Sequence, residues 1–260
     1  MAARIRTNSL TKTFRTKHGV LTAFAGLSLA IAPGEFVCVT GPSGCGKTSL
    51  LRILAGLDQP SSGQLTVEAS ATGRAPRVAM AFQEHALLPW LSLRDNVSFV
   101  LHERDSAQAH SEALTLLTRV GLQDFANLYP HQVSGGMRQR ASLARAFATQ
   151  PDLLLMDEPF VFVDYQTRAS LQRLLLAQWE GSGKTVVFVT HDLEEAVLLA
   201  NRVVVLTSHP GSVKTELRVD LPRPRTLEGL RTQAAFHALV ARLEEAVQSL
   251  PSMEPNLAVS

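Results

Sequence analysis

The sequence predicts an α/β fold built around a parallel sheet, and three stretches carry this prediction. The first is a strand-length apolar run over Phe36–Thr40, which a glycine-rich loop at residues 41–48 joins to a helix at residues 49–55. The other two are unbroken apolar runs over residues 153–156 and 185–190. Such runs are typical of parallel strands that are covered on both faces. The 260 residues are enough for one large α/β domain or two small ones.

The glycine-rich loop fits the phosphate-binding pattern G-x-x-x-x-G-K-[ST], and it reads Gly41-Pro42-Ser43-Gly44-Cys45-Gly46-Lys47-Thr48. The glycines let successive backbone N–H groups point inward and cradle phosphate oxygens at the start of the following helix. Lys47 would reach the outer phosphates, the Thr48 hydroxyl would hold Mg²⁺, and Ser49 completes the predicted site. A glycine turn that merely caps a helix is the competing interpretation, and the flanking strand and helix disfavour it. The sequence therefore predicts a P-loop nucleoside triphosphatase.

Composition and charge exclude several classes of protein. Hydrophobic residues make up 45% and charged residues 18%, as in globular proteins rather than disordered or fibrous ones. The 25 basic and 23 acidic residues leave a net charge of +2, so no nucleic-acid partner is expected. The amino-terminal residues lack the apolar core of a signal peptide, and the apolar run at residues 20–32 is too short and too polar to span a bilayer. We therefore expect a protein that is soluble on its own.

Two cysteines flank the loop: Cys38 in the predicted strand and Cys45 in the loop itself. A disulfide between them would disrupt the phosphate site, so both are expected to be free thiols in a reducing compartment. Cys45 has two interpretations. It is either a small residue that fits the loop, which ordinary cysteine behaviour favours, or a reactive thiol whose pKa the helix start lowers.

Antiparallel strands are expected over residues 4–33, where apolar and polar residues alternate. Phe14 lies there among polar neighbours, and its ring could stack a purine base or simply cover the sheet edge. Further short strands are expected at residues 64–67 and 78–82. The apolar loop at residues 84–91 either folds under the domain or is offered to a partner.

Residues 92–149 are predicted to be mainly helical, with an apolar stripe over residues 106–120. The tripeptide Ser134-Gly135-Gly136 then precedes a helix at residues 137–147. Ser134 is a candidate N-cap, and the two glycines would allow the phosphate of another molecule to approach the helix start closely. On its own this tripeptide is a weak signal, because a simple cap and turn explains it equally well.

Polar side chains follow the two later apolar runs. Asp157 and Glu158 end the first, and acids at the carboxyl end of a parallel strand face the crevice in which ligands bind. Asp157 would anchor Mg²⁺, and Glu158 would act as general base toward the attacking water. His191 ends the next strand, and Asp192 caps a helix that runs through Ala200. A lone histidine is more often structural than functional, but this position favours a functional role.

Taken in order, these motifs resemble those of the nucleotide-binding subunit of an ATP-binding cassette (ABC) transporter. The matching set is residues 41–48, Gln83, Ser134-Gly135-Gly136, Asp157-Glu158, Asp164 and His191. The resemblance implies a RecA-like core with an antiparallel β-subdomain and an inserted α-helical subdomain at about residues 90–150, all within residues 1–230. The remaining residues 231–260 would form a helix at 232–250 and a disordered tail.

The resemblance also implies how such a chain works. Two copies would pair head to tail and bury two ATP molecules, each between residues 41–48 of one copy and Ser134-Gly135-Gly136 of the other. Phe14 would stack on adenine, and His191 would hold the γ-phosphate. Gln83 would link Mg²⁺ and the attacking water to a membrane partner, and Asp164 would lie in the loop that joins the two active sites.

Further segments are similar to the importer ATPases for nitrate, aliphatic sulfonates and taurine. These segments are residues 87–90, 134–140, 190–196, His209-Pro210-Gly211 and residues 221–225. The similarity implies a peripheral protein on the cytoplasmic face of the inner membrane. Its partners would be permease subunits, reached through the Gln83–Trp90 region, and indirectly an external solute-binding protein.

The chain departs from these importers in its 159–164 segment. Pro-Phe is followed by Val161-Phe162-Val163-Asp164, where relatives have Gly-Ala-Leu-Asp; Val133 and Met137 are milder departures. Val161 is expected to strain a backbone position that suits glycine, and Phe162 to crowd the dimer seam. Two functions therefore remain open: an ATPase that powers import, which Glu158 favours, and a regulatory or structural subunit with vestigial hydrolysis.

Overall fold

The computed structural model describes residues 2–17, 19–69, 74–83, 86–101 and 104–248. By its internal contacts the chain divides into two compact units. The first comprises Met1–Ala3 and Glu68–Val186, and the second comprises Arg4–Val67 and Val187–Ser260. The predicted disordered tail at residues 251–260 lies outside the described residues, as do Glu84 and His85 of the predicted apolar loop. Within the described residues, no helix is both long enough and apolar enough to cross a membrane.

The second unit contains the predicted antiparallel strands. Strands β1 (Ala3–Thr16) and β2 (Gly19–Ile31) pair antiparallel, with Ile5 opposite Ile31 and Phe14 opposite Leu21. The sheet order is β2-β1-β4, where β4 spans Ser62–Ala69 and is therefore longer than the predicted strand at residues 64–67. The exposed Phe14 of the central strand β1 thus lies opposite the exposed Leu21 of the edge strand β2.

A parallel ladder carries the glycine-rich loop in the same unit. Strand β3 (Phe36–Thr40) has two neighbours: β7 (Thr185–Val189) and β8 (Arg202–Leu206), which pairs parallel with it. Strand β8 pairs antiparallel with β9 (Val213–Arg218) on its other side. All five residues of β3 are buried, because hydrophobic side chains cover both faces. The Phe36 and Phe188 rings meet inside this core with centroids 6.0 Å apart.

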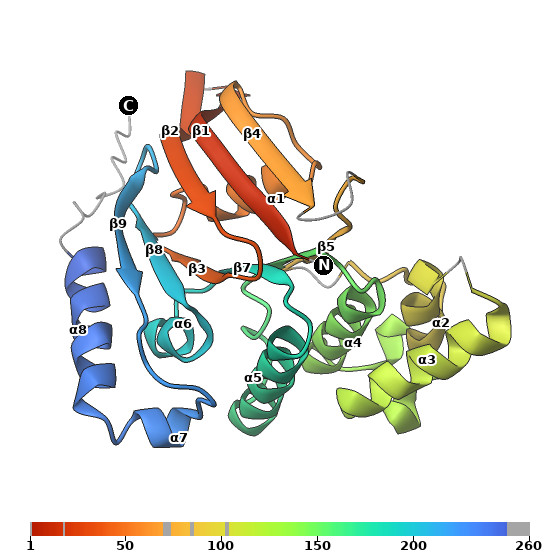
Figure 1. Cartoon of the computed structure of the whole chain (residues 1–260). Helices are drawn as coiled ribbons and strands as arrows, with labels where there is room; N and C mark the ends of the chain where they lie inside the picture. Colours follow the sequence, from red (N-terminus) through yellow and green to blue (C-terminus); the bar gives the residue numbers. More distant parts are fainter. Residues whose placement is uncertain (1, 18, 70–73, 84–85, 102–103, 249–260) are drawn as a thin grey trace, which may run out of the picture. The chain divides into compact units, whose positions relative to one another are not determined.

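The described part of the second unit also contains the helices α1 (Lys47–Leu54), α6 (Leu193–Leu199), α7 (Leu227–Leu230) and α8 (Ala234–Gln248). Helix α1 begins two residues earlier than the predicted helix at 49–55, inside the glycine-rich loop. Helix α8 packs on α6, β8 and β9 through the buried Phe236 and Leu243, so the predicted carboxyl-terminal helix is present and docked (Figure 1).

The first unit is mainly helical, as the sequence predicts. Strands β5 (Val78–Ala81) and β6 (Leu153–Asp157) pair parallel. The chain between them forms the helices α2 (Leu93–Ser98), α3 (Ser106–Arg119) and α4 (Gly135–Ala148). It also forms the short 3-10 helices η1 (Phe99–Leu101), η2 (Gln123–Phe125) and η3 (Pro130–Gln132). Helices α2, α3 and α4 pack against one another (Figure 1). Helix α5 (Tyr165–Glu180) follows β6.

Candidate functional site

The glycine-rich loop adopts the backbone that phosphate binding requires. Gly41, Gly44 and Gly46 have φ angles of 148°, 78° and 91°, a region that residues with a Cβ rarely enter. Gly46 is also the N-cap of α1 and supplies no side-chain cap, so the first backbone N–H groups of the helix are left for an anion. The loop therefore fits the phosphate groups of a nucleotide.

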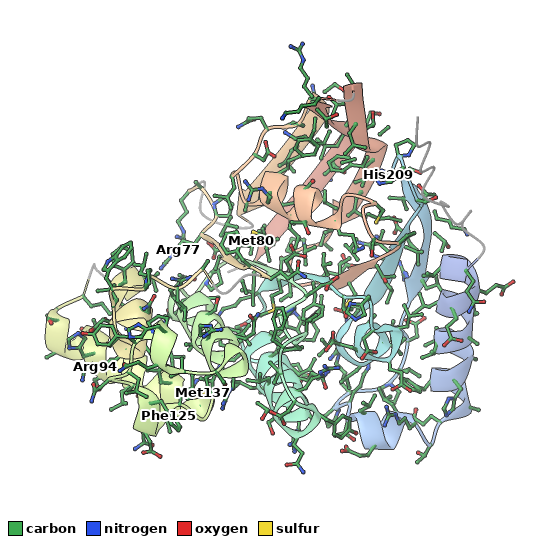
Figure 2. All side chains as sticks on the ribbon, turned by 180° about the vertical axis from the view of Figure 1, so that it is seen from behind. Arg77, Met80, Arg94, Phe125, Met137 and His209 are labelled. Atoms are coloured by element: carbon green, nitrogen blue, oxygen red, sulfur yellow. The ribbon has the colours of Figure 1, made fainter. Side chains whose placement is uncertain are left out.

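Packing demands glycine at the same positions. A Cβ atom built on Gly41 would lie 2.8 Å from the Leu206 carbonyl oxygen, and one on Gly46 would lie 2.8 Å from the Phe24 ring. A Cβ on Gly44 would lie 2.8 Å from His209 Nε2. His209 belongs to the loop after β8 (Figure 2). The loop is therefore shaped by its neighbours as well as by its own φ angles.

Lys47 places its charge inside the loop. Its side chain is buried, and Nζ donates to the carbonyl oxygens of Gly41 at 2.8 Å and Pro42 at 2.9 Å. An ammonium fixed in this way raises the local positive potential where the backbone N–H groups of the loop gather. The Thr48 side chain, one residue on, is exposed.

Cys45 is not the reactive thiol that one of the two interpretations describes. The side chain is fully buried, and burial raises the pKa of the thiol above its usual value, although the Lys47 ammonium opposes the shift. Burial also raises the pKa of Cys38. Both cysteines are free, as predicted, and Cys45 is the small residue that fits the loop.

Phe14 and His191 are the other predicted nucleotide contacts in the second unit. The Phe14 ring is 38% exposed, and Lys12 Nζ lies 5.0 Å from its centroid, so the ring is accessible to solvent and makes a cation–π contact; stacking on adenine stays a prediction. His191 is exposed at the end of β7. The Asp192 carboxylate accepts from the Glu195 N–H at 3.0 Å and caps α6, as predicted.

In the first unit, the predicted acids follow β6. Asp157 is the last residue of this strand and is buried, and Glu158 comes next with a φ angle of 45°. A left-handed conformation at a residue other than glycine is strained and is concentrated at functional sites. The expectation of strain at Val161 is wrong, because the positive φ angle of this segment falls on Glu158 and not on Val161.

The segment after Glu158 ends in a helix cap. The Asp164 carboxylate accepts from the Thr167 N–H at 3.0 Å, and this hydrogen bond lowers the pKa of Asp164. Phe162 is 55% exposed and Val161 is 38% exposed. The segment therefore presents two apolar side chains to its surroundings, where the similar importers have small ones.

Ser134 caps α4, as predicted, through a hydrogen bond from the Met137 N–H to its hydroxyl at 3.3 Å. A Cβ atom on Gly136 would lie 3.0 Å from the Phe162 carbonyl oxygen, so the start of α4 packs tightly on the 159–164 segment of the same unit. The sequence pattern does not reveal this contact, since 25 residues separate the two positions along the chain.

Gln83 is exposed after β5, and Asn96 organises the loop that follows. Asn96 is buried, and its Nδ2 donates to the carbonyl oxygens of Leu88 at 3.0 Å and Leu91 at 3.1 Å. Trp90 is 70% exposed, whereas Leu88 is half-buried. The leucines of this loop therefore fold partly against the domain and Trp90 faces solvent, while a partner at this loop stays a prediction.

Comparisons with known proteins agree with this geometry. A model of the ABC transporter family matches residues 24–161. An aliphatic sulfonates import ATP-binding protein of Burkholderia cenocepacia, SsuB 2, is 46% identical over 235 residues, which are 90% of this chain and 85% of that protein. An ABC transporter ATP-binding protein of Methanocaldococcus jannaschii is 42% identical over 228 residues, which are 86% of this chain and 85% of that protein.

Solved structures show the same fold. The dimeric post-hydrolysis state of the ATP-binding cassette MJ0796, bound to ADP and Pi, superposes with a TM-score of 0.77 at 31% identity. The match covers 84% of this chain and 100% of that chain. The chain therefore belongs to the ABC transporter family. Within that family it is an ATP-binding ATPase subunit, which confirms the predicted P-loop nucleoside triphosphatase fold.

The arrangement of His, Cys, Asp and Glu side chains limits how a metal ion could be bound. In the part of the chain that the structure describes, no group of three or more His, Cys, Asp or Glu side chains could hold a metal ion. Mg²⁺ commonly takes only one or two protein ligands and completes its shell with phosphate oxygens and water. The assignment of Thr48 and Asp157 as Mg²⁺ ligands therefore stays a prediction.

Proposed function

We propose that this ATPase powers the uptake of a small anion, an aliphatic sulfonate, through an ABC importer. The observation that carries this proposal is the 46% identity to an aliphatic sulfonates import ATP-binding protein over 90% of the chain. Nitrate and taurine importers remain the alternatives within the same group, because the sequence motifs are shared among them.

We propose the following roles for the site residues. Residues 41–48 with Ser49 bind the phosphates of ATP, and Lys47 neutralises the charge that develops on them. Thr48, Gln83 and Asp157 hold Mg²⁺, whose charge would stabilise the departing phosphate. Glu158 takes the proton of the attacking water, and His191 holds the γ-phosphate in line. Phe14 stacks on the adenine base.

The proposed assembly is a head-to-tail pair of chains. Ser134-Gly135-Gly136 of the second copy would complete the phosphate site of the first, with Asp164 in the loop that joins the two sites. The dimeric state of the related cassette MJ0796 supports this arrangement. ATP binding would therefore stabilise the dimer, and hydrolysis of ATP would allow the two copies to separate.

The remaining partner is a membrane permease. We propose that it docks on the Gln83–Trp90 region of a peripheral subunit, since the exposed Trp90 offers it an amphipathic anchor. The helices at about residues 90–150 would then form the inserted subdomain of a nucleotide-binding domain at residues 1–230. Residues 231–260 would be an appendage of that domain.

Glu158→Gln tests the catalytic assignment. Loss of the general base should reduce ATP turnover by about 10²–10⁴-fold while ATP binding persists, so ATP-dependent dimers should accumulate in size-exclusion chromatography. Glu244→Gln on α8 is the matched control, because Glu244 is exposed and undergoes the same change of charge. Unchanged turnover in Glu158→Gln would contradict the assignment.

The cargo requires a separate test. In cells that lack this chain, uptake of labelled ethanesulfonate should fall to background and return when the chain is supplied, but not when Lys47→Ala is supplied. Uptake of labelled nitrate should be unaffected. Loss of nitrate uptake with intact ethanesulfonate uptake would overturn the sulfonate proposal and leave the ATPase assignment standing.

A further inference from the structure

A cavity of about 740 Å³ lies within the second unit, and no residue of the glycine-rich loop lines it. Residues of β1, β2, β8 and β9 and of the segments that follow β2 and β9 line it. Part of its space exists because the chain places alanines there: Arg6 on β1 is opposite Ala30 on β2, and Ala32 also lines the cavity. Neither alanine has a side chain long enough to fill the hollow.

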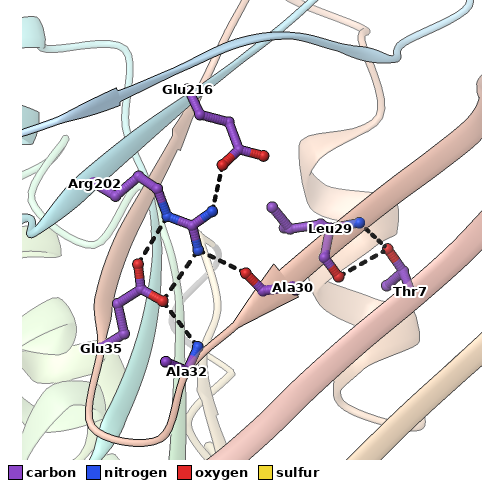
Figure 3. A network of polar contacts seen from close by, with 7 residues as sticks. All are labelled: Thr7, Leu29, Ala30, Ala32, Glu35, Arg202 and Glu216. Carbon is purple, nitrogen blue, oxygen red and sulfur yellow. Dashed lines mark hydrogen bonds and ion pairs between the residues drawn. The ribbon is translucent and has the colours of Figure 1, made fainter.

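Arg202 forms hydrogen bonds to two of the acids in this cavity, Glu35 and Glu216. Its guanidinium donates to both oxygens of Glu35, through Nε at 2.8 Å and Nη2 at 3.0 Å, and through Nη1 to Glu216 (Figure 3). Nη2 also donates to the Ala30 carbonyl oxygen at 2.7 Å. These hydrogen bonds raise the pKa of Arg202 in spite of its burial.

Three further guanidinium groups of the cavity have no such partners. Across the described residues, the side chains of Arg4, Arg6 and Arg218 make no hydrogen bond or ion pair. Their counterpart is a single remaining carboxylate, Asp220. Four arginines (Arg4, Arg6, Arg202 and Arg218) and three carboxylates (Glu35, Glu216 and Asp220) line the cavity, so its positive charges exceed its negative charges by one. Because Arg202 already engages Glu35 and Glu216, the guanidinium groups that remain available are those of Arg4, Arg6 and Arg218.

Strand geometry directs these arginines into one space. Arg4 and Arg6 are two residues apart on β1 and flank the buried Ile5, so they share the face opposite to it. Arg218 pairs directly with Arg202 across β9 and β8, and directly opposed residues point to the same face of a sheet. Guanidinium groups thus reach the cavity from two different sheets.

We propose that this cavity binds a small organic anion with two or more oxyanion groups, held by Arg4, Arg6 and Arg218. The planar guanidinium fork matches carboxylate and sulfonate oxygens two at a time, which makes arginine suited to such ligands. A ligand with two anionic ends ties β1 to β9, whereas an anion with one end engages only one of the two sheets. The site is independent of the nucleotide site and of the transported solute.

Citrate and ethane-1,2-disulfonate are the probes, and isothermal titration calorimetry on the full chain is the measurement. In Mg²⁺-free buffer at constant ionic strength, at least one of the two should bind saturably with one site per chain, and acetate should bind at least about tenfold more weakly. The probe that binds more tightly identifies the ligand as a carboxylate or a sulfonate.

Variants separate the cavity from other anion sites. Arg6→Gln/Arg218→Gln should weaken binding by at least about tenfold, while its ATPase rate without the probe stays at the original value and shows that the chain is folded. Arg242→Gln on α8, an exposed arginine outside the cavity, is the matched control and should bind as before. Lys47→Ala should also bind the probe as before.

Three results would overturn the proposal. The first is that neither probe binds. The second is that binding is lost in Lys47→Ala and kept in the double variant, which would place the anion on the glycine-rich loop. The third is that Arg242→Gln weakens binding as much as the double variant, which would mean that the effect depends only on the total charge of the chain.

Discussion

The loop at residues 41–48 and the segment at residues 158–164 follow strands of the same kind, yet they are built in opposite ways. Each follows a five-residue strand that is completely buried, β3 in one case and β6 in the other. The first loop owes its shape to side chains that are missing, because neighbours occupy the Cβ positions of Gly41, Gly44 and Gly46. The second contains no glycine and places its left-handed residue at Glu158.

This difference indicates which amino-acid substitutions each region tolerates. Glycine is fixed in the first loop by φ angle and by contact together, so a substitution there disturbs both the backbone and the packing. In the second segment, Val161 and Phe162 are exposed side chains on a backbone that neither of them strains. Their effect should therefore appear in assembly and turnover rather than in folding.

The largest effect is expected from Gly46→Ala. A Cβ atom there combines a φ angle of 91° with a 2.8 Å approach to the Phe24 ring, so the free energy of unfolding should fall by about 2–5 kcal/mol and ATP binding should be lost. Gly56→Ala is the matched control, because Gly56 has a φ angle of 72° and nothing lies within 4 Å of its missing Cβ.

The control separates strain from crowding. Gly56→Ala should lower the free energy of unfolding by only about 1–2 kcal/mol and should bind ATP normally. Chemical denaturation and nucleotide titration of both variants measure the two effects. Equal losses in the two variants would mean that contact with Phe24 contributes nothing.

A smaller effect is expected from Phe162→Ala. Since the ring is 55% exposed, the free energy of unfolding should change by no more than about 0.5 kcal/mol. Removal of the ring should tighten ATP-dependent dimers and raise turnover, as measured by the ATPase rate over a range of protein concentrations. Val161→Gly should add little, because Val161 does not occupy a left-handed conformation. An unchanged rate in Val161→Gly/Phe162→Ala would show that the departure from the similar importers has no functional consequence.

The smallest effect concerns the two thiols. Because burial raises the pKa of both Cys38 and Cys45, each should have less thiolate at neutral pH than a free cysteine. Iodoacetamide should therefore label the folded chain slowly, and labelling of Cys45 should accelerate only as the pH rises above the usual cysteine range. Mass spectrometry of the folded and denatured chain measures this. Rapid labelling of folded Cys45 at pH 7 would show that the loop opens.

The sequence was most informative where function depends on local pattern. The residues of the glycine-rich loop, the buried strands β3, β6 and β7, and the caps Ser134 and Asp192 follow from spacing and residue type alone. Helix α1 begins two residues before the predicted helix, because the loop lysine already has a helical conformation.

Long-range contacts could not be predicted in this way. His209 against Gly44, and Phe162 against Gly136, join segments that are distant in sequence and carry no shared pattern. Arg225 is a further case, because no local pattern predicts that it is buried and donates to the carbonyl oxygens of Ala200 at 2.7 Å and Leu221 at 2.8 Å. The error at Val161 has the same origin, because a strained φ angle is set by the whole turn and not by one residue.

Disulfide trapping tests the proposed ATP-bound pair most directly. Ser43→Cys and Gly135→Cys would be combined with Glu158→Gln to block hydrolysis, and with Cys38→Ala and Cys45→Ser to remove the native thiols. We expect covalent dimers when ATP is present, and few with ADP or with either new cysteine alone. Absence of covalent dimers with ATP bound would contradict the arrangement in which the glycine-rich loop of one copy and Ser134-Gly135-Gly136 of the other enclose the nucleotide.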